Sequence, residues 1–254
     1  MNLTYLRYDM MRSLREISGL IFGIGLPIGL YVMFGVLPDY ATQRIPQWNG
    51  NVSAVTMISM ALYGAMTMGG TLSAESAAEF KRGWGRQLAL TPMSATQYVL
   101  TKTAGIQLLA ALPIVCTFLV GSATNAELDG AGWLTAGLLA WVTILPVNLI
   151  GLGLGSLLRS DAAERVVAGA LVVFGFLGNL FMPLSGTMLE IARFTPLYAA
   201  NALSRYPANN GWNIDNMGQI GLHESWPMAL ANFAIWTLLS AVFAIYAVRR
   251  PQEK

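Results

Sequence analysis

The residues best suited to acid–base chemistry in this sequence are its only histidine, His223, and the neighbouring acid, Glu224. The chain contains no G-x-S-x-G pattern, no H-E-x-x-H pattern and no carboxylate pair inside an apolar segment. The only cysteine, Cys116, lies in an apolar run, so neither a disulfide framework nor a cysteine-based metal site can form. We therefore expect no catalytic residue, no metal and no cofactor in this chain, and we interpret His223 as a solvated loop residue.

Nucleotide-binding patterns are also missing. Gly151, Gly153 and Gly155 alternate with leucines, but no strand and no βαβ unit surrounds them, so they are not a dinucleotide fingerprint. A Walker A loop needs G-x-x-x-x-G-K-[ST], and no lysine in the chain follows a glycine. Any ATP hydrolysis must therefore be carried out by another polypeptide.

The composition is that of a membrane protein. Of the 254 residues, 55% are hydrophobic and 11% are charged, whereas soluble domains carry about 25% charged residues. Coupling to protons or sodium usually places Asp, Glu or His within membrane spans. The expected spans hold only Asn148, Asn179, Asn232 and hydroxyl residues as notable polar groups. The scarcity of ionisable residues in the spans favours a transporter that is driven mechanically by a separate protein and not by an ion gradient.

Apolar runs predict an all-α membrane protein with one transmembrane domain over residues 1–254 and six transmembrane helices. The six spans are expected at about 18–37, 52–73, 95–121, 133–158, 166–182 and 226–248. Ser94 and Gln97 have the spacing of a capping box for the third span. Gly19/Gly23 and Gly25/Gly29 are small residues four apart, a spacing that lets another helix approach closely.

Three shorter segments are expected to lie at the membrane surface. Residues 3–17 alternate apolar and charged positions with a helical period, which predicts an N-terminal interfacial helix. Residues 185–194 and 197–206, separated by Thr195-Pro196, are each too short to cross the bilayer. We expect them to be short outer re-entrant or interfacial helices before the last span.

Basic residues set the expected orientation. With six spans and the N-terminus inside, twelve of the fifteen Lys and Arg residues fall in cytoplasmic segments and only Arg44, Arg193 and Arg205 fall outside. Four tryptophans mark the expected outer interface: Trp48, Trp133, Trp212 and Trp226. Both termini are therefore predicted to be cytoplasmic, in a multi-pass protein of a bacterial cytoplasmic membrane.

The chain is organised around the polar stretch from Glu75 to Lys102, ESAAEFKRGWGRQLALTPMSATQYVLTK. Four basic residues, a Gly-Trp-Gly turn and a Thr-Pro break separate two long apolar runs. Charged residues are costly inside a bilayer, so this hinge must lie at one membrane face. Lys102 is close enough to the helix end to extend its ammonium group to the interface.

The layout resembles the permease subunits of ABC-2-type transporters, which include bacterial drug and polysaccharide exporters. The most specific piece is EFKRGWGRQLALTPMS at residues 79–94, followed by Tyr98 and Lys102. It is similar to the acid, Arg-Gly, Leu-x-x-x-Pro-x-Ser, Tyr, Lys pattern between the second and third spans of drug-export members. Phe194-Thr195-Pro196-Leu197 also resembles the outer proline-containing helices of that family.

The resemblance implies a permease that exports a hydrophobic or amphipathic compound such as a drug, an antibiotic or a lipid-like molecule. A separate ABC ATP-binding subunit would hold the ATP and Mg²⁺, and two permease copies or paralogues would line the path. The hinge would couple to the ATPase through Trp84, Arg86, Gln87, Leu88 and Leu90. Glu75 and Glu79 would lie at the cytoplasmic gate. The lipid bilayer is a further partner, and we expect no nucleic-acid partner.

Two other functions fit parts of the sequence. An ATPase-independent channel or scaffold would need no partner, but the spans offer no ring of charged residues for a pore. An ABC importer permease would carry a cytoplasmic loop that begins Glu-Ala-Ala with a glycine at fixed spacing. Here Glu75-Ser-Ala-Ala departs from that start, and Gly83 lies too far along the chain.

Overall fold

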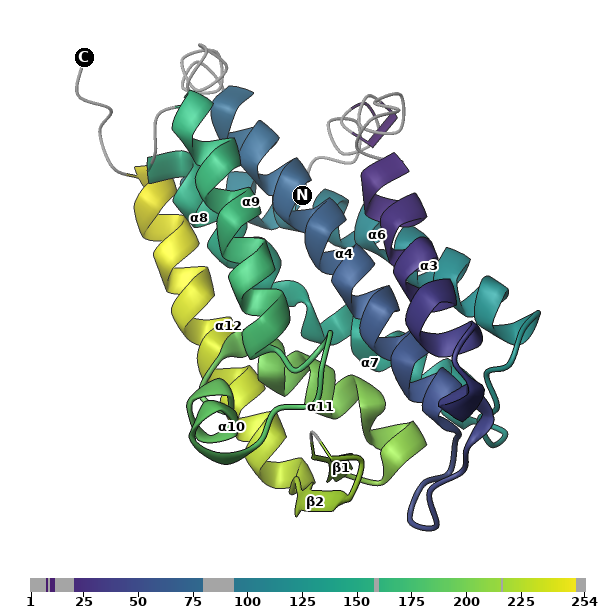
Figure 1. Ribbon diagram of the computed structural model, residues 1–254. Helices are drawn as coiled ribbons and strands as arrows, with labels where there is room; N and C mark the ends of the chain where they lie inside the picture. The colour runs from purple at the N-terminus through teal and green to yellow at the C-terminus, as the bar shows by residue number, and fades with distance from the viewer. Residues whose placement is uncertain are drawn as a thin grey trace.

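The computed structural model describes residues 8, 10–11, 21–79, 94–157, 160–215 and 217–249. In these residues the chain forms a bundle of tilted helices with a small strand pair at one end (Figure 1). The interfacial helix predicted for residues 3–17 lies almost entirely outside the described residues. It remains a prediction.

The first apolar segment is a short helical run. It consists of a π-helical turn at Ile21–Gly25 (η1), an α-helix at Leu26–Tyr31 (α3) and a second π-helical turn at Val32–Val36 (η2). Pro27 stands near the start of α3, where its missing N–H is tolerated. Of the predicted glycine positions, Gly19 lies outside the described residues, Gly23 packs against Met68, and an added Cβ on Gly25 or Gly29 would have no described neighbour within 4 Å.

Two long helices follow. The first is Val52–Glu79 (α4), which follows a loop that contains the 3-10 turn Asp39–Thr42 (η3). Asn51 caps its first turn, because its Oδ1 accepts from the Ala54 N–H at 2.9 Å. Ala95–Ser122 (α6) begins at the predicted capping box. There Ser94 Oγ accepts from the Gln97 N–H at 3.2 Å, and Gln97 Oε1 accepts from the Ser94 N–H at 3.0 Å.

The fourth predicted span is present as one apolar segment over 132–157, with an interruption inside it, whereas the fifth is displaced along the chain. The fourth is divided into Gly132–Thr143 (α7) and Leu145–Leu157 (α8), with the break at Ile144. Pro146 explains the break, because it has no N–H to continue the helical ladder. The fifth, Ser160–Leu177 (α9), begins and ends about five residues before the predicted 166–182. The turn after it contains Asn179, which has a left-handed φ of 57° and accepts the Leu184 N–H on its side-chain oxygen at 3.0 Å.

The region before the last helix contains both predicted short helices and one unpredicted sheet. The helices are Gly186–Ala192 (α10) and Pro196–Asn209 (α11), and Thr195 caps α11 through the Tyr198 N–H. Two antiparallel strands follow, Trp212–Ile214 (β1) and Ile220–His223 (β2), with Trp212 paired with His223. The all-α prediction is wrong at this point. The turn between the strands places Gly218 at a φ of 75°, which glycine adopts without strain.

Trp226–Arg249 (α12) completes the fold. Among the described residues, four segments are long and apolar enough to cross a membrane: 52–73, 96–122, 132–157 and 226–249. Residues 21–36 form a shorter apolar helix. The protein is thus a mostly helical integral membrane protein, and the predicted count of six spans remains a prediction.

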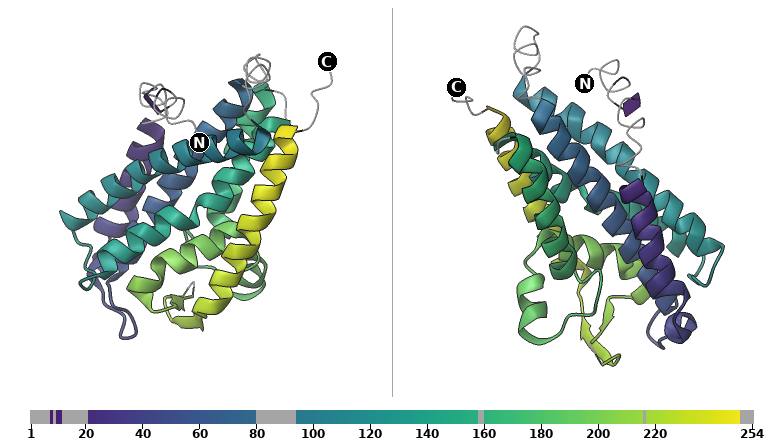
Figure 2. Two further views of the ribbon diagram at one scale, coloured as in Figure 1. Left: turned by 180° about the vertical axis from the view of Figure 1, so that it is seen from behind. Right: turned by 45° about the horizontal axis from the view of Figure 1, so that its top comes forward.

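Helix α4 is the centre of the bundle. It contacts α3, α6, α8, α9 and α11. In its most apolar stretch 83% of the residues are buried, whereas the figure is 17% for α12, which lies at the edge of the bundle (Figure 2). Glycines let its neighbours approach. A Cβ on Gly64 would meet Pro113 of α6 and Pro27 of α3 at less than 3 Å, and a Cβ on Gly69 would meet Asn148 of α8. Close packing of this kind is typical of helices in membranes.

The bundle has two distinct ends. At the first, here called the tryptophan end, Trp48 Nε1 donates to the Trp212 carbonyl at 2.8 Å, Trp133 Nε1 donates to the Leu128 carbonyl at 3.0 Å, and Trp226 packs on Tyr206. At the second, here called the hinge end, α4 finishes, α6 begins and α12 finishes (Figure 1). The four tryptophans predicted to mark one interface therefore do lie together.

Candidate functional site

At the hinge end, the last turns of α4 are held against the first turns of α6. Tyr98 is 2% exposed and its hydroxyl donates to the Ser76 carbonyl at 3.3 Å. Arg249 of α12 donates to Thr96 Oγ1 at 3.3 Å, so a third helix end lies beside the first turn of α6. The points where the hinge leaves and re-enters the bundle are therefore fixed next to each other.

The predicted gate residues lie at this end. Glu75 is partly buried in the penultimate turn of α4, and Glu79 is the last residue of that helix. Lys102, expected to extend to the interface, is instead 2% exposed within the protein, one turn beyond Tyr98. The five predicted coupling residues, Trp84, Arg86, Gln87, Leu88 and Leu90, lie outside the described residues. Their role remains a prediction.

A neutral polar cluster joins α4, α6, α7 and α8 in the middle of the bundle. Gln107 and Trp141 each donate a side-chain N–H to the other's backbone carbonyl. Asn148 donates to Gln107 Oε1 at 3.0 Å, and Ser73 donates to the Asn148 carbonyl at 3.1 Å. Every member of the cluster is uncharged. It therefore ties helices together and offers no site that could bind or release a proton near neutral pH.

The acid beside the histidine has a structural partner. Glu224 is 4% exposed, and Arg193 donates to its Oε1 through Nε and Nη2 at 3.2 and 3.0 Å. The Tyr198 hydroxyl donates to Glu224 Oε2 at 2.7 Å. Burial, followed by the nearby charge of Glu224, raises the pKa of Tyr198, so its hydroxyl stays protonated as a donor. His223 is exposed, as predicted, but it is the last residue of β2 and does not lie in a loop; its ring lies 4.7 Å from that of Trp212.

These side chains join three elements at the tryptophan end. Arg193 follows α10, Tyr198 belongs to the first turn of α11, and Glu224 connects β2 to α12. Asn232 also donates to the Arg193 carbonyl, and Trp236 Nε1 donates to the Phe194 carbonyl at 2.7 Å. The arrangement fixes the short helices against α12. Both carboxylate oxygens of Glu224 thus accept hydrogen bonds from side chains that hold these elements together.

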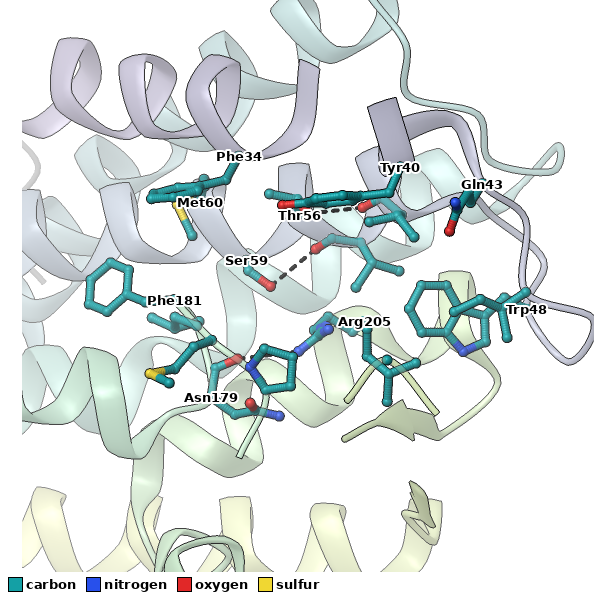
Figure 3. A pocket seen from close by; sticks show the side chains of 18 of the residues that line it. Phe34, Tyr40, Gln43, Trp48, Thr56, Ser59, Met60, Asn179, Phe181 and Arg205 are labelled. Atoms are coloured by element: carbon teal, nitrogen blue, oxygen red, sulfur yellow. Dashed lines mark hydrogen bonds between the residues drawn. The ribbon is translucent and has the colours of Figure 1, made fainter. Parts of the chain in front are cut away.

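A cavity also opens at the tryptophan end. It has a volume of about 500 Å³, and α4, α11, β1 and the turn after α9 contribute to its walls. Arg205 of α11 lines it, together with several aromatic side chains (Figure 3). From the sequence, Arg205 is predicted only as a basic residue on the outer side. Its place within an apolar-periodic segment was the signal that could have identified it, because such a position faces other protein elements.

The chain matches a known family over most of its length. The sequence model described as "ABC-2 family transporter protein" matches residues 39–248, which include α4, both short helices, the strand pair and all but the last residue of α12. The chain belongs to the ABC-2 transporter family. The family assignment agrees with the resemblance seen at the hinge.

One relative supports the same conclusion. The chain is 23% identical over 194 residues to the Bacillus subtilis (strain 168) protein named "Putative transport permease YvfS", covering 75% of this ABC-2 chain and 78% of that protein. The apolar helices and the family together identify an integral membrane component of a transporter. ABC-2 permeases generally have no ATPase site of their own, which agrees with the missing Walker A pattern.

Proposed function

We propose that this chain is the membrane-spanning permease subunit of an ATP-driven ABC exporter. The observation that carries the proposal is the family match over residues 39–248. The name of the Bacillus subtilis relative, a transport permease, supports it. In this proposal the whole chain, residues 1–254, is one transmembrane domain with six spans.

The energy comes from a separate ATP-binding subunit, which holds ATP and Mg²⁺. The absence of a Walker A pattern from this sequence supports the assignment of ATP hydrolysis to a separate subunit. The hinge between α4 and α6 docks on that subunit through Trp84, Arg86, Gln87, Leu88 and Leu90. Glu75 and Glu79 lie at the gate on the same side. The hydrogen bond from Tyr98 to the Ser76 carbonyl holds the end of α4 beside the start of α6. A movement of the hinge would therefore displace both helices together.

The cargo is a hydrophobic or amphipathic compound, such as a drug, an antibiotic or a lipid-like molecule, moved outward across a bacterial cytoplasmic membrane. The apolar helices and the neutral polar cluster support an apolar path. Two permease copies or paralogues form the path, with both termini in the cytoplasm. The open side of α3 at Gly25 and Gly29 provides a surface for such pairing.

The docking part of the proposal is tested by the double variant Trp84→Ala/Leu88→Ala. Truncation of buried interface anchors costs about 2 kcal/mol or more, which corresponds to roughly thirtyfold weaker binding. We expect the variant to reach the membrane at normal abundance and to lose co-purifying ATPase and transport together. The measurement is pull-down of the ATPase subunit beside the membrane abundance of the permease.

Leu100→Ala is the matched control, because Leu100 is 62% exposed on the apolar outside of α6. It should leave ATPase binding unchanged. ATPase recovery with the double variant equal to that with the wild-type chain would show that the hinge is not the docking surface. ATP turnover by the purified chain alone would refute the permease proposal itself.

A further inference from the structure

The cavity at the tryptophan end has the size and walls of a ligand site. Its volume of about 500 Å³ lies within the range of sites for drug-sized ligands. Phe34, Met60 and Phe181 provide apolar walls, and Tyr40 lies near the same space (Figure 3). Phe34 and Tyr40 are 36% and 50% exposed, so the aromatic side chains extend from the interior to the surface.

The guanidinium of Arg205 is poorly satisfied by the protein. In the described part of the chain its one hydrogen bond runs from Nη1 to the Asn179 carbonyl at 3.3 Å. That carbonyl already accepts from Asn201 Nδ2 at 2.9 Å. Arg205 Nε is shielded from solvent and has no partner among the described residues. A shielded cationic donor without a partner is costly. Nη2 of the same guanidinium also has no partner among the described residues and is not shielded, so an anion bound there offsets part of that cost.

No acid near the cavity forms an ion pair with Arg205 in the described part of the chain. Asp215 lines the same space, but its Oδ1 accepts from the backbone N–H groups of Met217 and Gln219, both at 2.9 Å. Glu224 is bound by Arg193 and Tyr198. Burial lowers the pKa of Arg205 to about 10, so it remains a cation at neutral pH. The cavity therefore combines apolar walls with one cation that has no ion pair in the described residues.

We propose that this cavity binds a small amphipathic anion, with its carboxylate, sulfonate or phosphate group at Arg205 and its apolar body against Phe34, Met60 and Phe181. The planar guanidinium can donate two parallel N–H groups to two oxygens of such a group. Identifying the occupant as the exported compound rests on the proposed function, whereas binding itself does not. The anionic group can belong to a soluble organic acid or to a lipid headgroup.

The test is equilibrium binding to the full chain in nanodiscs of phosphatidylcholine, without any ATPase. Two probes are used: naphthoate, which carries a carboxylate, and naphthamide, its neutral counterpart. Arg205→Met should weaken naphthoate binding tenfold or more, because a hydrogen-bonded charge is lost, and should leave naphthamide binding nearly unchanged. The control Arg44→Met removes an exposed cation at the same end and should change neither affinity.

A second variant tests the cavity from the opposite wall and keeps Arg205 intact. Thr56→Phe places a ring from α4 into the space, and both probes should then bind at least tenfold more weakly. Arg205→Lys should retain part of the naphthoate binding, since it keeps the charge but loses the fork of donors. Naphthoate affinity that is unchanged in both Arg205→Met and Thr56→Phe would overturn the proposal.

The source of the anion is decided by adding phosphatidylglycerol to the nanodiscs. If phosphatidylglycerol displaces naphthoate from the wild-type chain, and displaces less of it from the Arg205→Lys chain, the cavity binds an anionic lipid headgroup. Unchanged naphthoate affinity assigns it to a soluble amphipathic acid. Because no ATPase is present, these results are independent of whether the chain exports anything.

Discussion

At the scale of single residues, the most constrained group is the buried carboxylate of Glu224. Arg193 and Tyr198 bind its two oxygens separately. The Arg193 side chain is 25% exposed and that of Glu224 is 5% exposed, so solvent screens the pair only from one side. Exposed pairs contribute little to stability, whereas breaking a buried pair leaves an uncompensated charge. The Glu224 contacts should therefore matter for stability more than any surface pair.

Tyr198→Phe tests this expectation. It removes one charge-assisted hydrogen bond while the Arg193 contact remains, and should lower the free energy of unfolding by about 1.5 to 3 kcal/mol. The measurement is helical circular dichroism during unfolding in mixed micelles. Glu127→Gln is the control, because its pair with Arg44 is more than half exposed and should contribute less than about 1 kcal/mol. Equal losses from the two variants would contradict this assignment.

At the scale of elements, glycines on α4 determine how closely its neighbours pack. A Cβ on Gly69 would lie 2.0 Å from Asn148 Oδ1, which is too short for any contact. Asn148 Oδ1 has no hydrogen-bond partner among the described residues, so it lies against α4 without a bond that holds it there. The position of α8 depends on the absence of a side chain at this point.

We expect Gly69→Ala to separate α4 from α8 and to cost about 1 to 3 kcal/mol or more, the usual range for overpacking. Gly29→Ala is matched in chemistry, but an added Cβ there has nothing within 4 Å among the described residues, so the isolated chain should tolerate it. Thermal unfolding of both variants in detergent measures the difference. A Gly69→Ala protein as stable as Gly29→Ala would show that α8 does not pack as closely on α4 as described.

Locally determined features were predictable from the sequence. The start of α6 follows from Ser94 and Gln97, which lie three residues apart and need no distant partner. The start of α11 follows from Thr195-Pro196 in the same way. The break at Ile144 was available in principle from Pro146, but a long apolar run concealed it. Apolar composition alone does not distinguish one membrane helix from two shorter ones in line.

Features that depend on distant residues were not predictable. Arg205 faces a cavity because α11 lies against α4 and the turn after α9, and no local pattern specifies that arrangement. The strand pair is short, and its register depends on a turn at Gly218 within a polar segment that has little alternation. The predicted coupling residues belong to a third group, since they lie outside the described residues and await experiment.

At the scale of the whole molecule, the charges are separated between the two ends. Arg44, Arg193 and Arg205 all lie at the tryptophan end, while Arg249 and Lys102 lie toward the hinge end. The positive-inside rule, applied to the twelve basic residues that the sequence assigns to the same side as Arg249, predicts that the hinge end faces the cytoplasm. The proposed docking surface for the ATPase requires the same orientation.

Cysteine labelling of intact cells checks the orientation, in a Cys116→Ala background. Ser122→Cys and Met217→Cys, which are exposed at the tryptophan end, should react with an impermeant maleimide from outside. Ser94→Cys, exposed at the hinge end, should react only after the membrane is opened. Labelling of Ser94→Cys in intact cells would reverse the orientation and remove the docking surface from the side where ATP is available.

Helix α4 also has a mechanical consequence. Its 28 residues contain no proline, so it forms one stiff rod about 42 Å long at 1.5 Å per residue. Its first turns line the cavity at Val52, Val55 and Ser59, and its last turn carries Glu79. A rod that tilts about its middle moves its two ends in opposite directions. A force that moves one end of α4 toward the bundle axis therefore moves its other end away from that axis. The helix between the two ends need not rearrange.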